Sequence, residues 1–383
     1  MGMMEKILRL MSEKKASDVY LSANSPVMIK IGGVCVPVNS QALPADGPYT
    51  LLSEILSEEQ LAEFNQSKEL NVAVPLPGIG RFRVSAMRQR GSCAVVIRFI
   101  NIDIPSIESL KIPPILADMI VAKRGLILVV GATGSGKSST LAALLDHRNA
   151  NTSGHILTIE DPVEFLFKNK KSIVNQREVG TDTESLYIAL KNALRQAPDV
   201  ILIGEIRDRE TMSLAISYSQ SGHLVLATMH ANNSYQALNR MLNFYPVEVR
   251  ASMLNDLASA LKAIISQRLL RSVEGGRVPA VEVMVNTRLI SELIEKGDFF
   301  GVREALEKSM AEESQTFEAD IARLITTGQV ERKEGLSYAD SPTNLMWRLQ
   351  NEAAAALTTP NAAAAEPEPE GPSFTNFTLD VKH

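Results

Sequence analysis

The stretch Gly131-Ala132-Thr133-Gly134-Ser135-Gly136-Lys137-Ser138-Ser139 decides how this chain folds. Its first eight residues match the phosphate-binding loop pattern G-x-x-x-x-G-K-[ST]. The stretch follows an apolar run at 126–130 and precedes a predicted helix over 139–148, which is the order that such a loop requires. We therefore expect all nine residues to form a nucleotide site, in which Lys137 reaches the β and γ phosphates of ATP and Ser138 binds Mg²⁺.

Around this loop the sequence predicts an α/β fold with a parallel sheet. Uninterrupted apolar runs alternate with helical segments, and such runs are typical of strands that are buried on both faces. The predicted strands lie at 126–130, 156–159, 200–203 and 224–228. This β-α-β alternation predicts a RecA-like ATPase core.

Helices are predicted between and after these strands. A capping box formed by Thr181 and Glu184 predicts the start of one helix, which continues through Leu186, Leu190 and Leu194. After about residue 250 the chain is expected to be mostly helical, interrupted by a strand at 280–285. The apolar stripe that predicts this helix consists of Leu254, Leu257, Leu261, Ile264 and Ile265.

Polar residues follow each predicted strand of the core. Parallel strands point the same way, so their carboxyl ends meet at one edge of the sheet, where ligands bind. The first strand ends at the phosphate loop, and the others end at Glu160, Asp161 and Glu164, at Glu205, and at His230. A magnesium-ATP site needs a carboxylate near the metal and a group that holds the attacking water. The sequence therefore predicts ATP hydrolysis, with the roles of Glu160, Asp161 and Glu164 left open.

Two histidines flank the fourth strand. His223 and His230 are seven positions apart, which corresponds to roughly 23 Å along a strand. They cannot share a metal within one subunit. His230 lies at the ligand edge and is placed to sense the γ-phosphate, whereas His223 lies at the far edge, where a structural and a functional role are equally expected.

Arginines concentrate in the first 105 residues and after the third strand. The group consists of Arg81, Arg83, Arg88, Arg90, Arg98, Arg207 and Arg209. Most are expected on solvated strand faces. An NTPase that works as a ring often uses an arginine finger from its neighbour to stabilise transition-state charge. The candidate arginine fingers are Arg81, Arg98, Arg207 and Arg209.

The first 105 residues are predicted to form a separate α+β domain. We expect a helix at 4–15, a strand at 19–21 and a helix at 51–61. Two hairpins are predicted, one turning at Gly32-Gly33 and one joining 82–89 to 94–100. A proline-containing boundary then leads to the ATPase core at 106–285, a helical C-terminal segment at 286–350 and a flexible tail at 351–383. Residues 374–381 of that tail form a short apolar piece, and we expect that this segment can dock on another surface, which the sequence does not identify.

Composition excludes several classes of protein. The net charge of -5 and the 5% aromatic content argue against a nucleic-acid motor, which needs a basic, aromatic channel, so no nucleic-acid partner is expected. No apolar run approaches the roughly 18 residues of a membrane span, and charges interrupt the N-terminal apolar positions, so a cytoplasmic location is expected. Cys35 and Cys93 lie in apolar strand-like runs and are predicted to be buried thiols.

Four segments resemble, in order and spacing, the Walker A, Asp box, Walker B and His box of the secretion ATPase superfamily. They are GATGSGKSS (131–139), TIEDPVE (158–164), ILIGEIRDRET (201–211) and SGHLVLATMHANN (221–233). The likeness covers about residues 1–350 and is strongest for the type IV pilus retraction ATPases of the PilT/PilU kind, especially over 177–211. By residue, the resemblance implies nucleotide and Mg²⁺ binding by Lys137 and Ser138, a general base at Glu164, a metal-holding acid at Glu205, and a His box completed by His223 and His230.

The resemblance also implies an assembly. In this family a PAS-like N-terminal domain of one subunit packs against the RecA-like domain of the next in a homohexameric ring. ATP closure then rotates an inner-membrane pilus platform protein, which implies a peripheral position at the cytoplasmic face of the inner membrane. Where the principal retraction motor usually carries a motif like AIRNLIRE, this chain reads TRLISELIEKG at 287–297. This departure and the long tail favour the accessory PilU-like branch, which acts with a PilT-type partner.

Two rival interpretations remain to be compared with the structure. Pilus-assembly and type II secretion ATPases share the four segments but usually insert a four-cysteine zinc module after the His box, where this chain has no cysteine. A scaffold that has kept the fold but lost turnover is disfavoured by the intact Lys137, Ser138 and Glu205.

Overall fold

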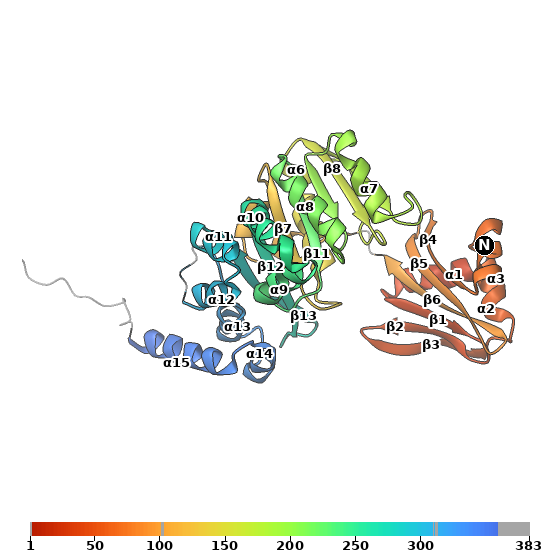
Figure 1. The fold of residues 1–383 in the computed structure, drawn as a ribbon. Coiled ribbons are helices and arrows are strands. Elements are labelled where there is room, and N and C mark those ends of the chain that lie inside the picture. The colour runs from red at the N-terminus through yellow and green to blue at the C-terminus, as the bar shows by residue number, and fades with distance from the viewer. Residues whose placement is uncertain (1, 101–102, 309, 311–312, 359–383) are drawn as a thin grey trace, which may run out of the picture.

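The structure is a computed structural model that describes residues 2–100, 103–308, 310 and 313–358. Figure 1 shows two sheets side by side in one elongated molecule: a red-to-orange antiparallel sheet at one end and a helix-covered sheet in the middle. A cluster of blue helices occupies the other end. The sheet in the middle carries the phosphate-binding loop.

The N-terminal sheet has six strands in the order β3-β2-β1-β6-β5-β4, and all its neighbouring strands are antiparallel. Helices α1 (Met3–Glu13), α2 (Gly47–Ser53) and α3 (Glu58–Ser67) pack on it, with Met4, Leu52 and Phe64 in the shared core. The strands are β1 (Asp18–Ser22), β2 (Pro26–Ile31), β3 (Val34–Ala42), β4 (Glu69–Leu76), β5 (Gly80–Gln89) and β6 (Ser92–Ile100).

Both predicted hairpins are confirmed, as β2-β3 and β5-β6. The single helix predicted at 51–61 is wrong, because Ser57 forms a capping box with Gln60 and starts a new helix there. Strand β4 was not predicted; it contains Pro75, which is tolerated because β4 lies at the sheet edge.

The two cysteines differ in environment. Cys93 is buried, as predicted, and burial raises the pKa of its thiol. Cys35 is exposed, so its predicted burial is wrong. It lies on β3, an edge strand whose residues are exposed or only partly buried along its whole length.

The second sheet has seven strands in the order β13-β12-β7-β11-β10-β8-β9, and all neighbours are parallel except β12 and β13. The four predicted core strands are confirmed. The strands are β7 (Gly125–Val130), β8 (Gly154–Glu160), β9 (Ser172–Glu178), β10 (Val200–Ile203), β11 (Leu224–Met229), β12 (Leu261–Arg271) and β13 (Arg277–Val285).

Helices cover both faces of this sheet, so alternate residues of one strand enter different cores. Leu126 and Leu128 of β7 join the core under the first group of helices, and Ile127 and Val129 join the core under the second. The first group is α7 (Leu186–Ala193), α8 (Arg209–Gln220), α9 (Ser234–Asn243), α10 (Arg250–Ala260), α11 (Arg288–Glu295) and α12 (Phe299–Glu307). The second is α4 (Ile107–Leu110), α5 (Ile115–Ile120) and α6 (Lys137–Asn151).

Two helix predictions are corrected in this region. The stripe beginning at Leu254 predicts a helix through Ile265, but α10 ends at Ala260 and Leu261 starts β12, which pairs with β7. An apolar run in a buried strand has no period that distinguishes it from a helix. The capping box of Thr181 with Glu184 is also wrong, because α7 is capped by Ser185, whose hydroxyl accepts from the Ile188 amide.

The C-terminal segment packs against β12 and β13. Its core includes Leu270, Phe317 and Leu345. The helices are α13 (Phe317–Thr326), α14 (Arg332–Tyr338) and α15 (Pro342–Thr358). Because α15 runs to Thr358, the tail predicted from 351 starts too early. The piece at 374–381 lies outside the described residues. Across the described ranges, we find no helix with the length and apolar character needed to cross a bilayer.

Candidate nucleotide-binding site

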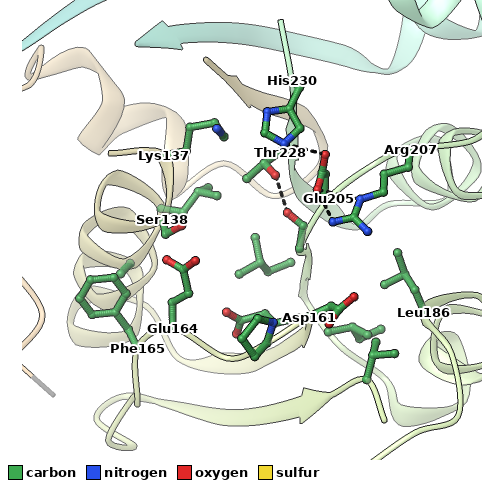
Figure 2. Close-up of a pocket in the computed structure, with 18 of the residues that line it drawn as sticks. Lys137, Ser138, Asp161, Glu164, Phe165, Leu186, Glu205, Arg207, Thr228 and His230 are labelled. Atoms are coloured by element: carbon green, nitrogen blue, oxygen red, sulfur yellow. Dashed lines mark hydrogen bonds and ion pairs between the residues drawn. The ribbon is translucent and has the colours of Figure 1, made fainter. Parts of the chain in front are cut away.

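A cleft of about 560 Å³ opens at the carboxyl edge of the parallel strands. Figure 2 shows side chains from several strand ends converging on it. The predicted site residues that line the cleft are Thr133, Gly134, Lys137, Ser138, Glu160, Asp161, Glu164, Glu205, Arg207 and His230. The edge expected from the four strand ends therefore exists as one site.

Close packing by β12 explains why the phosphate loop contains glycine at its tightest points. A Cβ at Gly136 would lie 2.6 Å from Nε2 of Gln267, and φ there is +89°. A Cβ at Gly131 would lie 2.6 Å from the carbonyl oxygen of the same Gln267. A larger residue at Gly131 would clash with the backbone of β12, and one at Gly136 would be strained by the positive φ. Ala132 and Ser135 line a second, smaller cavity of about 310 Å³ on another side of the loop.

The loop fits a polyphosphate. Helix α6 begins at Lys137, and its N-cap, Gly136, has no side chain to cap the first amides, so these N–H groups are available to an anion. The Lys137 ammonium donates to the carbonyl oxygens of Gly131 at 2.8 Å and Ala132 at 2.9 Å. Partial burial lowers the pKa of Lys137, and the nearby Glu205 and Glu164 oppose this effect. The lysine is thus a cation held over the loop, with two acids nearby.

The three acids at the end of β8 and in the loop after it lie in different environments. Glu160 is partly buried, and its carboxylate accepts from the Thr158 hydroxyl at 2.7 Å and the Gln176 amide at 3.4 Å. Loss of water around it raises the pKa of Glu160 to about 7, despite those two hydrogen bonds. Asp161 and Glu164 are exposed. In Figure 2 the Glu164 carboxylate points toward Ser138.

Glu205 is held from both sides. Its Oε1 lies 3.1 Å from Nε2 of His230, and its Oε2 lies 2.7 Å from the guanidinium of Arg207. The hydrogen bond to Glu205 raises the pKa of Arg207. Within the described ranges no three acids, histidines or cysteines cluster as a metal site. Mg²⁺ in nucleotide sites usually needs only one or two protein ligands besides phosphates and water, and Ser138 with Glu205 fits that need.

The remaining predicted residues lie away from the cleft lining. His223 is at the other end of β11, with Nδ1 3.1 Å from the Ser221 hydroxyl and 3.2 Å from the Tyr218 carbonyl oxygen. Among the arginines, Arg81 pairs with Glu178 at 2.9 Å, Arg98 pairs with Asp18 at 2.9 Å, and Arg209 stacks on the Tyr245 ring.

Sequence reasoning missed three contributors. Arg83, two positions after Arg81 on β5, lines the cleft, and this spacing places both on one face of the strand. Gln176 and Glu178 of β9 contact the loop that carries Glu164. The signal available for Arg83 was its alternation with Arg81. No signal was available for the other two, because β9 itself was not predicted.

Comparison with known proteins decides the family. A family model described as "Type II/IV secretion system protein" matches residues 2–278. The chain belongs to this family. It is 44% identical over 342 residues to the type IV pilus ATPase PilU of Pseudomonas aeruginosa, covering 89% of this chain and 90% of PilU. It is 36% identical over 339 residues to the retraction ATPase PilT of the same organism, covering 88% and 98% of the two chains.

Among solved structures, the pilus retraction motor PilT with bound ADP superimposes with a TM-score of 0.84. It is 35% identical to this chain, and the match covers 91% of this chain and 99% of that one. The ATPase DotB of Yersinia pseudotuberculosis follows with a TM-score of 0.76 and 26% identity, covering 88% and 92%. The predicted membership of the PilT/PilU group of secretion ATPases is confirmed.

Proposed function

We propose that this chain is a Mg²⁺-dependent ATPase that drives retraction of type IV pili, as a PilU-like accessory to a PilT-type motor. One observation carries the proposal: Lys137, Ser138, Glu164 and Glu205 line one cleft in a chain that matches PilU over 90% of PilU's length. A scaffold without turnover would have no need to keep a lysine and two acids around an uncapped helix start.

Each residue of the cleft has a proposed role. The amides of residues 131–139 bind the phosphates, and Lys137 places its charge on the β and γ phosphates. Ser138 and Glu205 would hold Mg²⁺, which supplies neutralisation of the phosphate charge when bound. Glu164, exposed and directed toward Ser138, accepts the proton of the attacking water. His230 keeps Glu205 in place and carries the response to the γ-phosphate.

The protonation of Glu160 supports the choice of Glu164 as the base. With a pKa of about 7 and one carboxylate oxygen engaged by Thr158 and Gln176, Glu160 is half neutral near pH 7 and partly buried. Asp161 is exposed at the rim of the same loop. We assign Glu160 to the structure of the loop and Glu164 to the chemistry.

Arg207 is the arginine we propose for transition-state charge within its own cleft, joined by Arg83. Arg98 and Arg209 contact Asp18 and Tyr245 of their own chain. To act as fingers in a neighbouring subunit, they would have to leave these contacts. His223 is hydrogen-bonded to residues next to the start of β11, and we propose that it stabilises the His box from outside the cleft.

The proposed assembly is a homohexamer. Residues 1–105 would form the PAS-like domain that packs on the RecA-like core, 106–285, of the next subunit, with the helical segment from 286 completing each subunit. The ring would work at the cytoplasmic face of the inner membrane on the pilus platform protein. Relatives named as type II secretion system proteins are less similar: 32% and 30% identical, with the match covering 57% and 52% of their lengths. This supports retraction over pilus assembly or secretion.

The test combines chemistry and motility. Lys137→Ala removes the fixed cation of the phosphate loop, and we expect ATP turnover by the purified protein to vanish while the protein still assembles. In a strain lacking this protein, we expect pilus retraction to be impaired, and the wild-type gene but not Lys137→Ala to restore it. Full turnover by Lys137→Ala would refute the site. Unchanged retraction, with the PilT-type partner present or absent, would refute the pilus role.

A further inference from the structure

The loop that carries Glu164 is fixed on both sides of this residue by side chains from β9. Residues 161–171 contain no helix or strand. Nevertheless, the Val163 amide donates to Oε2 of Glu178 at 3.0 Å, and the Phe165 carbonyl oxygen accepts from Nε2 of Gln176 at 2.8 Å. Both peptide neighbours of Glu164 are therefore held, and the position of its carboxylate depends on Gln176 and Glu178.

Glu178 is buried and takes its countercharge from the other sheet. Its side chain is 5% exposed, and its Oε2, the oxygen that accepts from Val163, also lies 2.9 Å from the guanidinium of Arg81. Arg81 belongs to β5 of the N-terminal sheet. The Thr181 hydroxyl donates to the other carboxylate oxygen at 3.2 Å. A buried carboxylate needs a charged partner and hydrogen bonds, so Arg81 supplies the countercharge of Glu178 and fixes its position.

Arg81 is committed to this contact. Its side chain is 20% exposed, and its Nε is buried without a hydrogen-bond partner among the described residues. In the part of the chain that the structure describes, no other side chain holds the Arg81 guanidinium as closely as the Glu178 carboxylate does. An arginine finger would instead extend its guanidinium to the ATP of a neighbouring subunit, so it could not stay bound to an acid of its own chain.

We propose that Arg81 and Glu178 form a positioning pair, through which the N-terminal sheet sets the place of Glu164. The inference rests on the proposed role of Glu164 as the base. Moving the N-terminal sheet away from β9 removes the countercharge of Glu178, releases Val163 and lets the Glu164 loop drift. Hydrolysis thereby depends on the placement of the N-terminal sheet, and Arg81 acts within its own chain and is not an arginine finger.

A double-mutant cycle separates the positioning pair from a finger. Glu178→Gln keeps a side-chain oxygen that can accept the hydrogen bond from the Val163 amide. It removes the buried negative charge of Glu178, so the ion pair with Arg81 no longer exists in this background. We expect Arg81→Met alone to lower kcat about 10- to 100-fold, since small misplacements of a catalytic group have effects of this size. The KM for ATP should change less than about twofold, because Arg81 does not line the phosphate loop. In the Glu178→Gln background, Arg81→Met should have no further effect.

Lys170→Met is the matched control. Lys170 forms an ion pair with Asp146 at 2.7 Å at the far end of the same loop. Because this pair is away from Glu164, its removal should leave kcat unchanged. Each variant is assayed as the assembled full-length protein, with its mass in solution measured. If Arg81→Met does not assemble, Arg81→Lys, which keeps a charge but not the fork of the guanidinium, replaces it in the cycle.

The outcomes distinguish this inference from the function it rests on. An equal loss of kcat from Arg81→Met in both backgrounds would overturn the positioning pair and favour a finger. Glu164→Gln is measured beside the cycle. If Glu164→Gln is inactive while Arg81 and Glu178 act independently, only the positioning pair fails. If Glu164→Gln hydrolyses ATP normally, the proposed base is wrong.

Discussion

Glu160 makes the stability of the protein depend on pH in a way that one substitution should remove. Its carboxyl has a folded pKa of about 7, against an ordinary value of 4.5, because the fold takes it out of water. Glu160→Gln keeps the shape and the contacts with Thr158 and Gln176. The substitution therefore imitates the protonated acid at every pH.

The sign follows from proton binding. Below about pH 4.5 Glu160 is protonated in both the folded and the unfolded chain. In that range the stability of the variant and that of the parent should therefore change with pH in the same way. Between 4.5 and about 7, the folded chain keeps a proton that the unfolded chain has lost, so stability falls as pH rises. At about 1.4 kcal/mol per pH unit, this one group removes roughly 3 kcal/mol by neutral pH. The free energy of unfolding of Glu160→Gln minus that of the parent should be larger at pH 8 than at pH 5, by about 2 to 3 kcal/mol.

Thermal unfolding without nucleotide measures this difference. For a domain of the size of the ATPase core, the predicted change corresponds to roughly 5 to 10 °C in the midpoint of unfolding. The midpoint of Glu160→Gln minus that of the parent should rise by this amount between pH 5 and pH 8. Glu63→Gln, at an exposed position on α3, controls for the loss of one negative charge. A constant difference across the pH range would refute the reasoning that burial controls Glu160.

Two further predictions follow from packing. Gly136→Ala, at a position with φ of +89° whose Cβ would lie 2.6 Å from Nε2 of Gln267, should weaken binding of a fluorescent ATP analogue about tenfold or more, because alanine is strained at this φ; unchanged affinity would refute the need for glycine at this position. Ile201→Ala, at a fully buried position of the central strand β10, should lower the free energy of unfolding in urea by about 2 to 5 kcal/mol. Ile173→Ala, at a position 59% exposed on edge strand β9, should change it by about 0.5 kcal/mol or less.

The parts of the fold that the sequence predicted are those with local signals. The glycines of the phosphate loop, the apolar runs of β7, β8, β10 and β11, and the Gly32-Gly33 turn each follow from the residues themselves. Because parallel strands all end at the same edge, correct strands were enough to bring Lys137, Glu164, Glu205 and His230 into one cleft.

The elements that were missed or misplaced depend on distant partners. Strand β9 alternates less clearly because it lies at the sheet edge, where only Ser172 and Glu178 of its residues are buried. Strand β12 was taken for a helix because its burial comes from β7 and β13 together, and burial on all sides leaves no period to read. Likewise, Ser185 caps α7 in place of Thr181, whose hydroxyl is occupied by Glu178.

The same limit explains why the arginines were the weakest part of the prediction. Arg81, Arg98 and Arg209 are alike in sequence, since each is an arginine in or beside a strand or helix with acids in reach. What separates them is the partner: a buried acid of the other sheet for Arg81, a buried acid of the same sheet for Arg98, and a tyrosine ring for Arg209. The acid that Arg81 faces, Glu178, also accepts a hydrogen bond from the Val163 amide in the loop that carries Glu164. An arginine therefore acquires its role here from the place of its partner in the fold, which only the folded chain determines.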